Sequence, residues 1–263
     1  MPTRQIRVPL GRLEAVLLRA GRVVKEAFQT APPGDWRLKA DRTPLTSTDL
    51  RLDAFLKAEL TRLCPEAGWL SEETADDRAR LDRDYVWVVD PLDGTKEFVH
   101  RIPELAVSVA LVRDGTPVLG AVINPVLGQG GMASEWARPQ FWGFPRRGHP
   151  VCVSRTESEA GRLAPFAPRL PGMRPVGSVA YKLLRVAAGL DRLYFSVEPK
   201  SEWDVCAGVA LLEFSGKTYL RFDGKANRFN QADTRIQCGA VAGPPRAAQA
   251  FLKRFADLIE RHA

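Results

Sequence analysis

Apolar residues near the N-terminus recur every three or four positions, which is the period of a helix with one buried face. The leucines and valines from Leu10 to Val24 predict an amphipathic helix over residues 10–28, and the Pro-Pro-Gly sequence at 32–34 would end it. A second helix is predicted from about Thr48-Asp49, because the leucines that follow also share one face.

The pattern then changes to runs typical of strands. Residues 84–89 (Asp-Tyr-Val-Trp-Val-Val) predict a strand that ends at Asp90. Two further strands, over 105–112 and 118–123, are predicted to form a hairpin across Asp114-Gly115. A helix is predicted to begin near Lys96, just after Gly94.

Residues 128–150 contain many Gly, Pro and aromatic residues without a clear period, so we place a boundary between two halves there. The expected division is an N-terminal α+β half (1–145) and a C-terminal α/β half (146–263). In the second half, helices and strands alternate: helix near 178–188, strand 192–195, helix 205–214, strand 218–222 and helix 245–261. This order predicts the α/β (α+β) class, with helices packed on mixed sheets.

Composition excludes several classes of protein. No apolar run among the 263 residues reaches the roughly 18 needed to span a bilayer, and the first ten residues lack the apolar core of a signal peptide, so a cytoplasmic protein is expected. The net charge of +7 comes from scattered Lys and Arg, which favours a solvated basic surface over a nucleic-acid site. The four cysteines lie far apart, which predicts free thiols and no zinc site, so any bound metal should have oxygen ligands.

The sequence Asp90-Pro91-Leu92-Asp93-Gly94-Thr95 is the leading candidate for chemistry. Two carboxylates at a strand end, followed by a glycine turn and a helix start, can hold hard cations and offer N–H groups to a phosphate. Taken alone, an Asp-rich turn with no further role is the simpler interpretation. The same holds for other acidic residues taken singly: Glu72-Glu73 can be a solvated pair, and Asp204 can cap a helix.

Four motifs that follow one another along the chain make a functional site the better interpretation of these acidic residues. They are the segment from Lys39 to Asp49 (KADRTPLTSTD), GWLSEE at 68–73, WVVDPLDGTKEF at 87–98 and EWDVCAGVALLEFSGK at 202–217. In these motifs and their order the chain resembles the inositol monophosphatase superfamily, magnesium-dependent and lithium-sensitive phosphatases. The resemblance implies the layered αβαβα sugar-phosphatase fold, two or three Mg²⁺ ions per site and a small phosphorylated substrate, with no nucleic-acid or membrane partner. It leaves open whether the protein is a homodimer.

The resemblance also implies roles for individual residues. Glu72, Asp90, Asp93 and Asp204 match metal ligands, with the Leu92 carbonyl beside them. Glu72 also matches a residue that orients the attacking water, and Asp49 and Thr95 match the pair that activates it. Asp93, Gly94 and Thr95 match the phosphate site. Ser178, Lys182 and Arg155 are candidates for an outer substrate contact, although a solvent-facing helix residue is an equal alternative for Lys182.

The substrate depends on the positions between the motifs. Lys96-Glu97-Phe98, the segment from Gly177 to Lys182, and Arg228 to Asp233 resemble the bacterial 3'(2'),5'-bisphosphate nucleotidases. Val197 stands where inositol-specific members have an acidic residue, although a one-residue shift of the alignment would bring Glu198 there. Trp136 and Trp142 are candidates for a wall that receives a base or sugar.

We therefore expect hydrolysis of the 3'-phosphate of adenosine 3',5'-bisphosphate, with the sulfated analogue as a further substrate. Inositol monophosphate, fructose 1,6-bisphosphate or histidinol phosphate is the alternative substrate. A non-catalytic polyanion-binding protein on the same fold is the alternative of another class.

Overall fold

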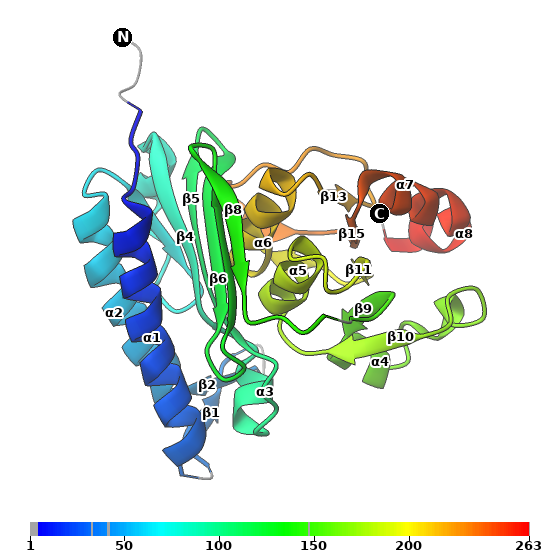
Figure 1. Ribbon diagram of the computed structural model, residues 1–263, viewed down its shortest axis with the longest axis horizontal. Coiled ribbons are helices and arrows are strands. Elements are labelled where there is room, and N and C mark those ends of the chain that lie inside the picture. The colour runs from blue at the N-terminus through cyan, green and yellow to red at the C-terminus, as the bar shows by residue number, and fades with distance from the viewer. Residues whose placement is uncertain (1–4, 33, 41–42, 147, 263) are drawn as a thin grey trace.

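The computed structural model describes residues 5–32, 34–40, 43–146 and 148–262. Five layers alternate between helices and sheets, as Figure 1 shows from α1 and α2 at one side to α7 and α8 at the other. This is the predicted αβαβα arrangement. The helices are α1 (Leu10–Thr30), α2 (Ser47–Leu63), α3 (Thr95–Val99), α4 (Arg155–Glu159), α5 (Val179–Ala187), α6 (Glu202–Phe214), α7 (Pro245–Arg254) and α8 (Ala256–Ile259), with short 3₁₀ segments at Arg78–Asp82, Ala164–Phe166 and Glu260–His262.

The first large sheet has six strands in the order β3-β4-β5-β6-β7-β8. Its strands are β3 (Gly68–Ser71), β4 (Tyr85–Asp93), β5 (Ala106–Arg113), β6 (Thr116–Asn124), β7 (Gln129–Ser134) and β8 (Ala137–Trp142). Only β3 and β4 run parallel. The predicted hairpin joins β5 to β6, and both of its turn residues, Asp114 and Gly115, have positive φ. Helices α1 and α2 cover one face and bury the predicted leucine stripe there.

Strands β7 and β8 lie in the segment that we expected to be irregular. All six residues of β7 are buried, so the strand shows no alternation of apolar and polar positions. Its two glycines accommodate aromatic rings of β8: a Cβ at Gly130 would lie 2.3 Å from the Trp142 ring, and one at Gly131 2.5 Å from the Phe141 ring. This use of glycine inside a strand explains why the pattern looked like a loop. The division at residues 145 and 146 stays a prediction, and the two large sheets fall on either side of it.

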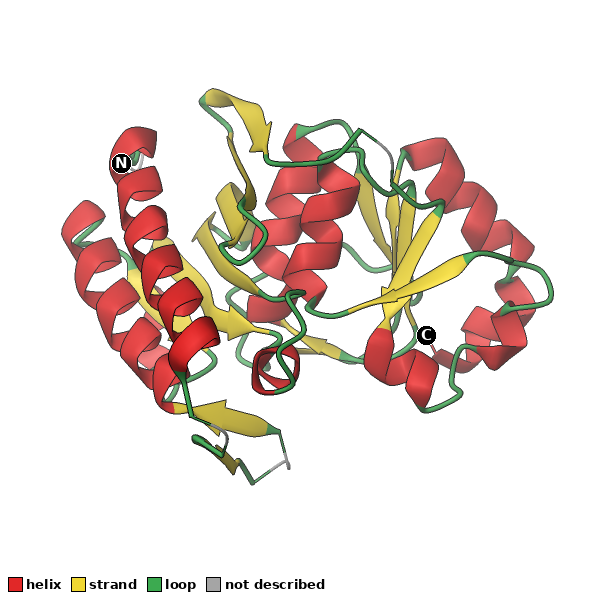
Figure 2. Cartoon of the chain, turned by 60° about the horizontal axis from the view of Figure 1, so that its bottom comes forward, coloured by secondary structure: helices red, strands yellow, loops and turns green. Residues whose placement is uncertain are grey.

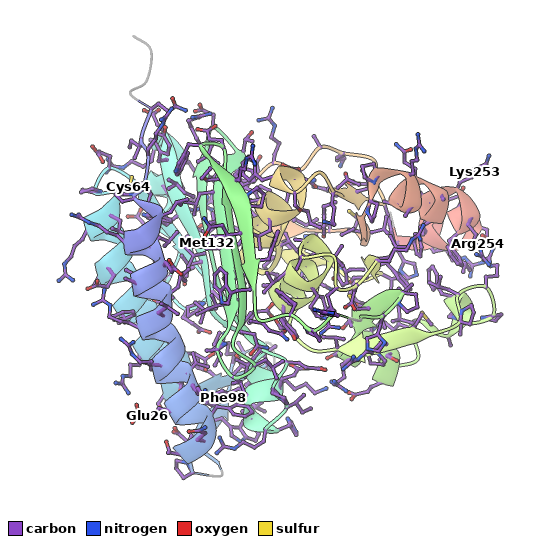
Figure 3. The ribbon with its side chains drawn as sticks, in the orientation of Figure 1. Glu26, Cys64, Phe98, Met132, Lys253 and Arg254 are labelled. Carbon is purple, nitrogen blue, oxygen red and sulfur yellow. The ribbon has the colours of Figure 1, made fainter. Side chains whose placement is uncertain are left out.

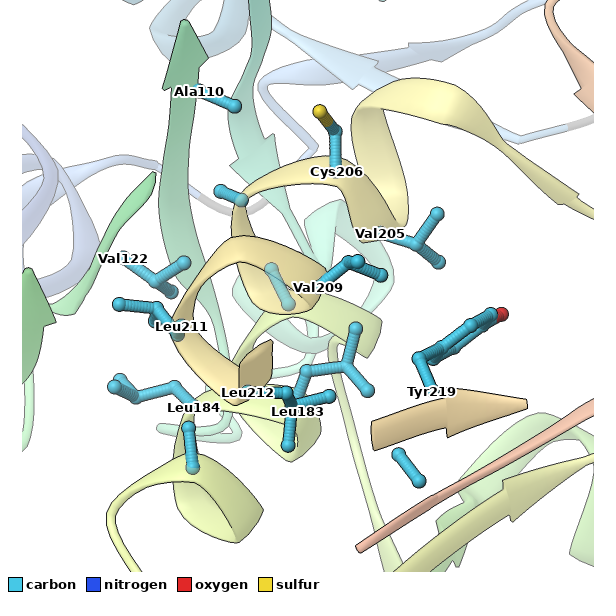
Figure 4. Close-up of a cluster of buried hydrophobic side chains, with 14 of the residues drawn as sticks. Ala110, Val122, Leu183, Leu184, Val205, Cys206, Val209, Leu211, Leu212 and Tyr219 are labelled. Carbon is cyan, nitrogen blue, oxygen red and sulfur yellow. The ribbon is translucent and has the colours of Figure 1, made fainter. Parts of the chain in front are cut away.

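The middle layer consists of α5 and α6. Figure 4 shows Val209, Leu211 and Cys206 of α6 packed between Ala110 and Val122 of the first sheet and Leu183 of α5. Because α6 is apolar on nearly all sides, it is buried between two sheets rather than on a surface. Helix α6 begins at Glu202, three residues before the start we predicted.

The second large sheet has five strands in the order β10-β9-β11-β15-β13, and α7 and α8 lie on the side away from α5 and α6 (Figures 1 and 2). Its strands are β9 (Val151–Ser154), β10 (Met173–Val176), β11 (Leu193–Ser196), β13 (Thr218–Arg221) and β15 (Ala240–Gly243), and two small ladders pair β1 (Trp36–Leu38) with β2 (Pro44–Thr46) and β12 (Lys200–Ser201) with β14 (Arg235–Ile236). A cluster of Phe166, Phe195, Phe251 and Phe255 holds the outer helices to the sheet. The single helix predicted over 245–261 is interrupted at Phe255.

Other sequence-based expectations concern the surface and the thiols. In the described part of the chain, no helix combines the length and the apolar character that crossing a membrane requires. All four cysteines are free and buried, as predicted. Figure 3 shows basic Lys253 and Arg254 on α7, at the opposite end of the molecule from Glu26 on α1.

Candidate active site

The site forms where β4 meets α3. The pairing of β4 with β5 shifts register between Asp90 and Asp93. Such an irregularity bends a strand, so the two carboxylates do not follow the regular alternation of side chains. Gly94 follows with φ +97°, and a Cβ there would lie 3.1 Å from the Glu104 carbonyl oxygen. Only glycine fits this close left-handed turn, which lets α3 start at Thr95 beside the two aspartates.

Like Asp49, Asp90 is buried, at 1% exposure. Its Oδ1 accepts the Leu92 N–H at 3.1 Å, whereas its Oδ2 is buried and has no hydrogen-bond partner among the residues that the structure describes. Burial raises the pKa of Asp90 well above its usual value, and the negative charges of Glu72, Asp93 and Asp204 raise it further. A buried carboxylate oxygen without a partner, facing other acids, is a position for a cation.

Asp49 and Thr95, the candidate pair for activating water, are joined by a hydrogen bond. Asp49 lies in the first turn of α2, where its Oδ2 accepts the Thr46 N–H at 2.8 Å in a capping box. Its Oδ1 accepts the Thr95 hydroxyl at 2.8 Å. Burial raises the pKa of Asp49, while the hydrogen bonds from Thr46 and Thr95 oppose that shift.

Asp204 occupies the same position in the first turn of α6. Its Oδ2 accepts the Ser201 N–H at 2.7 Å. Burial raises the pKa of Asp204 to about 7, and the charges of Asp93 and Glu72 add to the shift. Asp204 therefore caps its helix and also takes part in the acidic cluster, so the two interpretations of the sequence are compatible.

Asp93 is held by the start of α5. Its Oδ2 accepts the Ser178 hydroxyl at 2.7 Å and the Ala180 N–H at 2.6 Å. Burial raises the pKa of Asp93, and the positive charge of Lys182 opposes that shift. The Lys182 side chain is itself buried, with Nζ donating to the carbonyls of Val176 and Ser178 at 3.0 and 2.7 Å. Lys182 therefore does not face solvent, and Ser178 points at Asp93.

Glu72 faces Lys39, the first residue of the first motif, for which the sequence indicated no role. The ammonium group of Lys39 lies 2.6 Å from Glu72 Oε1 and 2.6 Å from Glu73 Oε1. Burial raises the pKa of Glu73 to about 7, against the effect of the Lys39 hydrogen bond. The position of Lys39 within a motif that also contains Asp49 is the signal that could have identified it.

The remaining candidates lie around this cluster. Arg155 pairs with Glu104, and its Nε, which has no hydrogen-bond partner, lies 3.8 Å from Glu97 Oε1. Glu198 forms an ion pair with Arg162 at 2.8 Å. Trp136 and Trp142 pack against the core between the first sheet and its outer helices, which does not support their role as a substrate wall.

The donor set fits a hard cation. Carboxylates with one buried oxygen unpaired, together with the Leu92 carbonyl, are the ligands that Mg²⁺ prefers. Within the described ranges, no three His, Cys, Asp or Glu side chains are already arranged as a metal-binding group. The hydrogen bonds above use one oxygen of each acid: Glu72 Oε1 accepts from Lys39, Asp93 Oδ2 from the start of α5, and Asp204 Oδ2 from its own N-cap residue. The ligand set remains a prediction, in which the other oxygens would face the metal.

A layered αβαβα fold with an acidic cluster at a strand end and an Asp–Thr pair beside it defines a class of phosphatase. A profile of the Inositol monophosphatase family matches residues 11–260, and the chain belongs to this family. The chain is a phosphatase, and the family is generally Mg²⁺-dependent.

Individual relatives agree with this assignment. The 3'(2'),5'-bisphosphate nucleotidase CysQ of Escherichia coli O157:H7 is 33% identical over 231 residues, covering 84% of this chain and 93% of the relative. A crystal structure of CysQ from Bacteroides thetaiotaomicron is 26% identical, with a TM-score of 0.69 over 89% of this chain and 96% of that one. An IMPase of Thermotoga maritima, 22% identical, shares the fold with a TM-score of 0.79 over 96% of this chain and 98% of that one.

Proposed function

We propose that this phosphatase removes the 3'-phosphate of adenosine 3',5'-bisphosphate, giving AMP and phosphate, with two or three Mg²⁺ ions at the site. The bisphosphate nucleotidases that match over most of the chain at 31–33% identity carry the choice of substrate. The Lys96-Glu97-Phe98 sequence after the Asp90–Thr95 segment supports it. We further propose a cytoplasmic location.

In this proposal Glu72, Asp90, Asp93, Asp204 and the Leu92 carbonyl hold the metal. Bound Mg²⁺ supplies positive charge that acidifies a water molecule and neutralises the leaving oxygen. The chain's own residues arrange the rest of the reaction.

The Asp49–Thr95 pair is suited to take the proton of the attacking water. The Thr95 hydroxyl donates to Asp49, which leaves lone pairs on Thr95 Oγ1 free to accept a proton from water. As the water oxygen bonds to phosphorus and the bond to the 3' oxygen breaks, the proton of the water passes through Thr95 to Asp49, and the released 3' oxygen takes a proton from solvent to become a hydroxyl. The N–H groups of Gly94 and Thr95, at the start of α3, donate to the phosphate oxygens.

Phosphate release from a panel of compounds tests the substrate. The panel is adenosine 3',5'-bisphosphate, its sulfated analogue, inositol monophosphate, fructose 1,6-bisphosphate and histidinol phosphate, each with Mg²⁺. We expect the nucleotide to have the highest kcat/KM, because Glu198, the candidate acidic contact for inositol, is paired with Arg162. Poor turnover of the nucleotide beside good turnover of inositol phosphate would reject the proposal. Salt-sensitive binding of nucleic acid with no hydrolysis at all would favour a polyanion-binding protein.

A ligand variant tests the metal role separately from the substrate. Asp93→Asn keeps an oxygen for the α5 contacts but removes the charge, so turnover should nearly disappear and excess Mg²⁺ should restore part of it. Ser178→Ala, which removes one hydrogen bond to Asp93, should weaken Mg²⁺ binding less. If Asp93→Asn lowers turnover by the same factor at low and at saturating Mg²⁺, Asp93 acts on the substrate alone.

A further inference from the structure

Glu202 is a buried acid in the first turn of α6 that the proposed reaction does not use. It is 1% exposed, yet no cation pairs with it directly in the described part of the chain. Instead its two oxygens accept the backbone N–H groups of Asn230 and Gln231 at 2.6 and 2.8 Å. Its own N–H donates to the Thr234 carbonyl at 2.9 Å. Glu202 therefore fixes residues 230–234, which we name the 230 loop, on the start of the helix that carries Asp204.

The other side of the 230 loop is held from the first half of the chain. Arg80, 2% exposed in the 3₁₀ segment Arg78–Asp82, donates to Asn230 Oδ1 at 2.6 Å and to the Gln231 carbonyl at 2.9 Å. The Asn230 side-chain amide returns a bond to the Arg80 carbonyl at 3.3 Å. Asp76 holds the Arg80 guanidinium with two further bonds.

Arg80 is in turn packed against the strand that leads to Glu72. A Cβ at Gly68 of β3 would lie 3.0 Å from both Arg80 Cα and Arg80 Cβ, so the two backbones are in close contact. Strand β3 ends at Ser71, immediately before Glu72. A continuous set of contacts thus runs from Glu72 through β3, Arg80 and the 230 loop to Glu202 and Asp204.

We propose that Arg80, Asn230 and Glu202 are positioning residues that set the spacing between Glu72 and Asp204. This inference rests on the proposed role of these two acids in holding Mg²⁺. They belong to different halves of the chain, and the contacts through β3, Arg80 and the 230 loop join the two. Two backbone N–H groups donate to the buried Glu202 carboxylate, and the Arg80 guanidinium donates to Asn230 Oδ1 and to the Gln231 carbonyl. These charge-assisted hydrogen bonds allow little variation in distance and angle, so they can fix the spacing of the two acids.

Magnesium binding by calorimetry, with thermal unfolding in parallel, tests the proposal on the full chain. Glu202→Gln replaces one acceptor oxygen with an amide nitrogen, which cannot accept a hydrogen bond from an N–H group. We expect the Kd for Mg²⁺ to rise about 10-fold, as is typical when the partner of a metal ligand is lost. Asn230→Gly is the milder variant: it keeps the positive φ of 58° and the N–H to Glu202 but removes both side-chain links to Arg80. It should also raise the Kd for Mg²⁺, by a smaller factor than Glu202→Gln does.

Asp191→Asn is the matched control. Asp191 is also buried and also accepts a backbone N–H, from His149 at 2.9 Å. Its contacts with His149, Arg185 and Cys152 all lie within the second half. This variant should lower Tm without changing the Kd for Mg²⁺. If Asn230→Gly and Glu202→Gln lower Tm as the control does and leave the Kd unchanged, the three residues are merely structural and the inference is wrong. Failure of the wild-type protein to bind Mg²⁺ would instead reject the proposed function on which the inference rests.

Discussion

Helices α2 and α6 both have an aspartate in the first turn that accepts the backbone N–H of the N-cap residue, yet the two aspartates have different neighbours in the site. At α2, Asp49 accepts the N–H of its N-cap residue Thr46 with one oxygen and the Thr95 hydroxyl with the other. At α6, Asp204 accepts the N–H of Ser201 with one oxygen, and its charge faces Asp93 and Glu72. Helix capping thus aims both carboxylates, and the neighbour of the second oxygen decides what each carboxylate does.

The difference appears in the two pKa values. Three hydrogen bonds to Asp49 partly offset its burial, whereas Asp204 has one such bond and two acidic neighbours, so its pKa rises to about 7. An aspartate with satisfied oxygens suits proton transfer through a fixed partner. An aspartate whose charge is poorly compensated suits a metal. Four experiments test this distinction.

The largest effect should come from Asp204→Asn. The amide can still accept the Ser201 N–H, so α6 should stay capped while the charge for the metal is lost. Loss of a residue that only supports a metal ligand costs up to about 100-fold in activity, so loss of a ligand itself should lower turnover by more than about 100-fold. High Mg²⁺ should restore part of the turnover. Steady-state rates over a Mg²⁺ titration measure both. A loss that excess Mg²⁺ leaves untouched would place Asp204 outside the metal site.

Thr95→Ala should lower kcat about 100-fold, which is the lower range for a group in proton transfer. The hydroxyl that links the water to Asp49 is gone, whereas the acidic cluster keeps its charges. Calorimetry should therefore show nearly unchanged Mg²⁺ affinity. A large loss of Mg²⁺ binding would mean that α2 and α6 do not differ in the way proposed.

The two N-cap residues provide a smaller contrast. Thr46→Ala removes a side chain that bonds both the backbone and the carboxylate of Asp49, so it should cost about 1 kcal/mol of stability and also reduce kcat. The Asp204 carboxylate, by comparison, is held by the backbone of Ser201, which survives in Ser201→Ala. That variant should keep its kcat. Urea unfolding and steady-state kinetics on both variants measure the two effects, and equal losses of kcat would contradict the contrast.

The smallest effect concerns pH and stability without metal. Because folding raises the pKa of Asp204 from an ordinary 3.8 to about 7, its stabilising contribution is complete at low pH and is lost as the pH rises toward 7. In chelator, Asp204→Asn should therefore gain stability relative to the wild type as the pH rises from about 4 to about 7, and should keep that advantage above pH 7. Thermal unfolding at several pH values measures this difference. Asp49→Asn should gain less, and a gain as large as that of Asp204→Asn would show that the hydrogen bonds of Asp49 do not offset its burial.

The sequence alone was most informative where a periodic pattern met a buried face. The apolar stripes of α1 and α2, the strand that ends at Asp90 and the Asp114-Gly115 hairpin follow from local rules, because each pattern has one interpretation. The four motifs were sufficient to indicate the family, since their residue types and order do not depend on packing. Their roles at the site still rest on that resemblance.

Local rules failed where a neighbour from elsewhere in the chain decides the conformation. Gly130 and Gly131 look like loop residues until the rings of β8 fill the space above them. Lys182 was as consistent with a surface position as with a substrate contact, and only the fold shows it buried behind Asp93. Glu202 and Asn230 lie in segments that carry the resemblance, but the sequence assigned no role to them or to Arg80, because their contacts join residues about 30 and 150 positions apart.

For this protein, then, the sequence determined the family, the layered fold and the acidic residues around Asp90. Those features depend on residue identity, hydrophobic period and local turn chemistry. The tertiary structure alone decided which oxygen of each acid is free, which acids share a site and which polar residues stand behind them. These depend on distances between distant segments, and a linear pattern does not contain such distances.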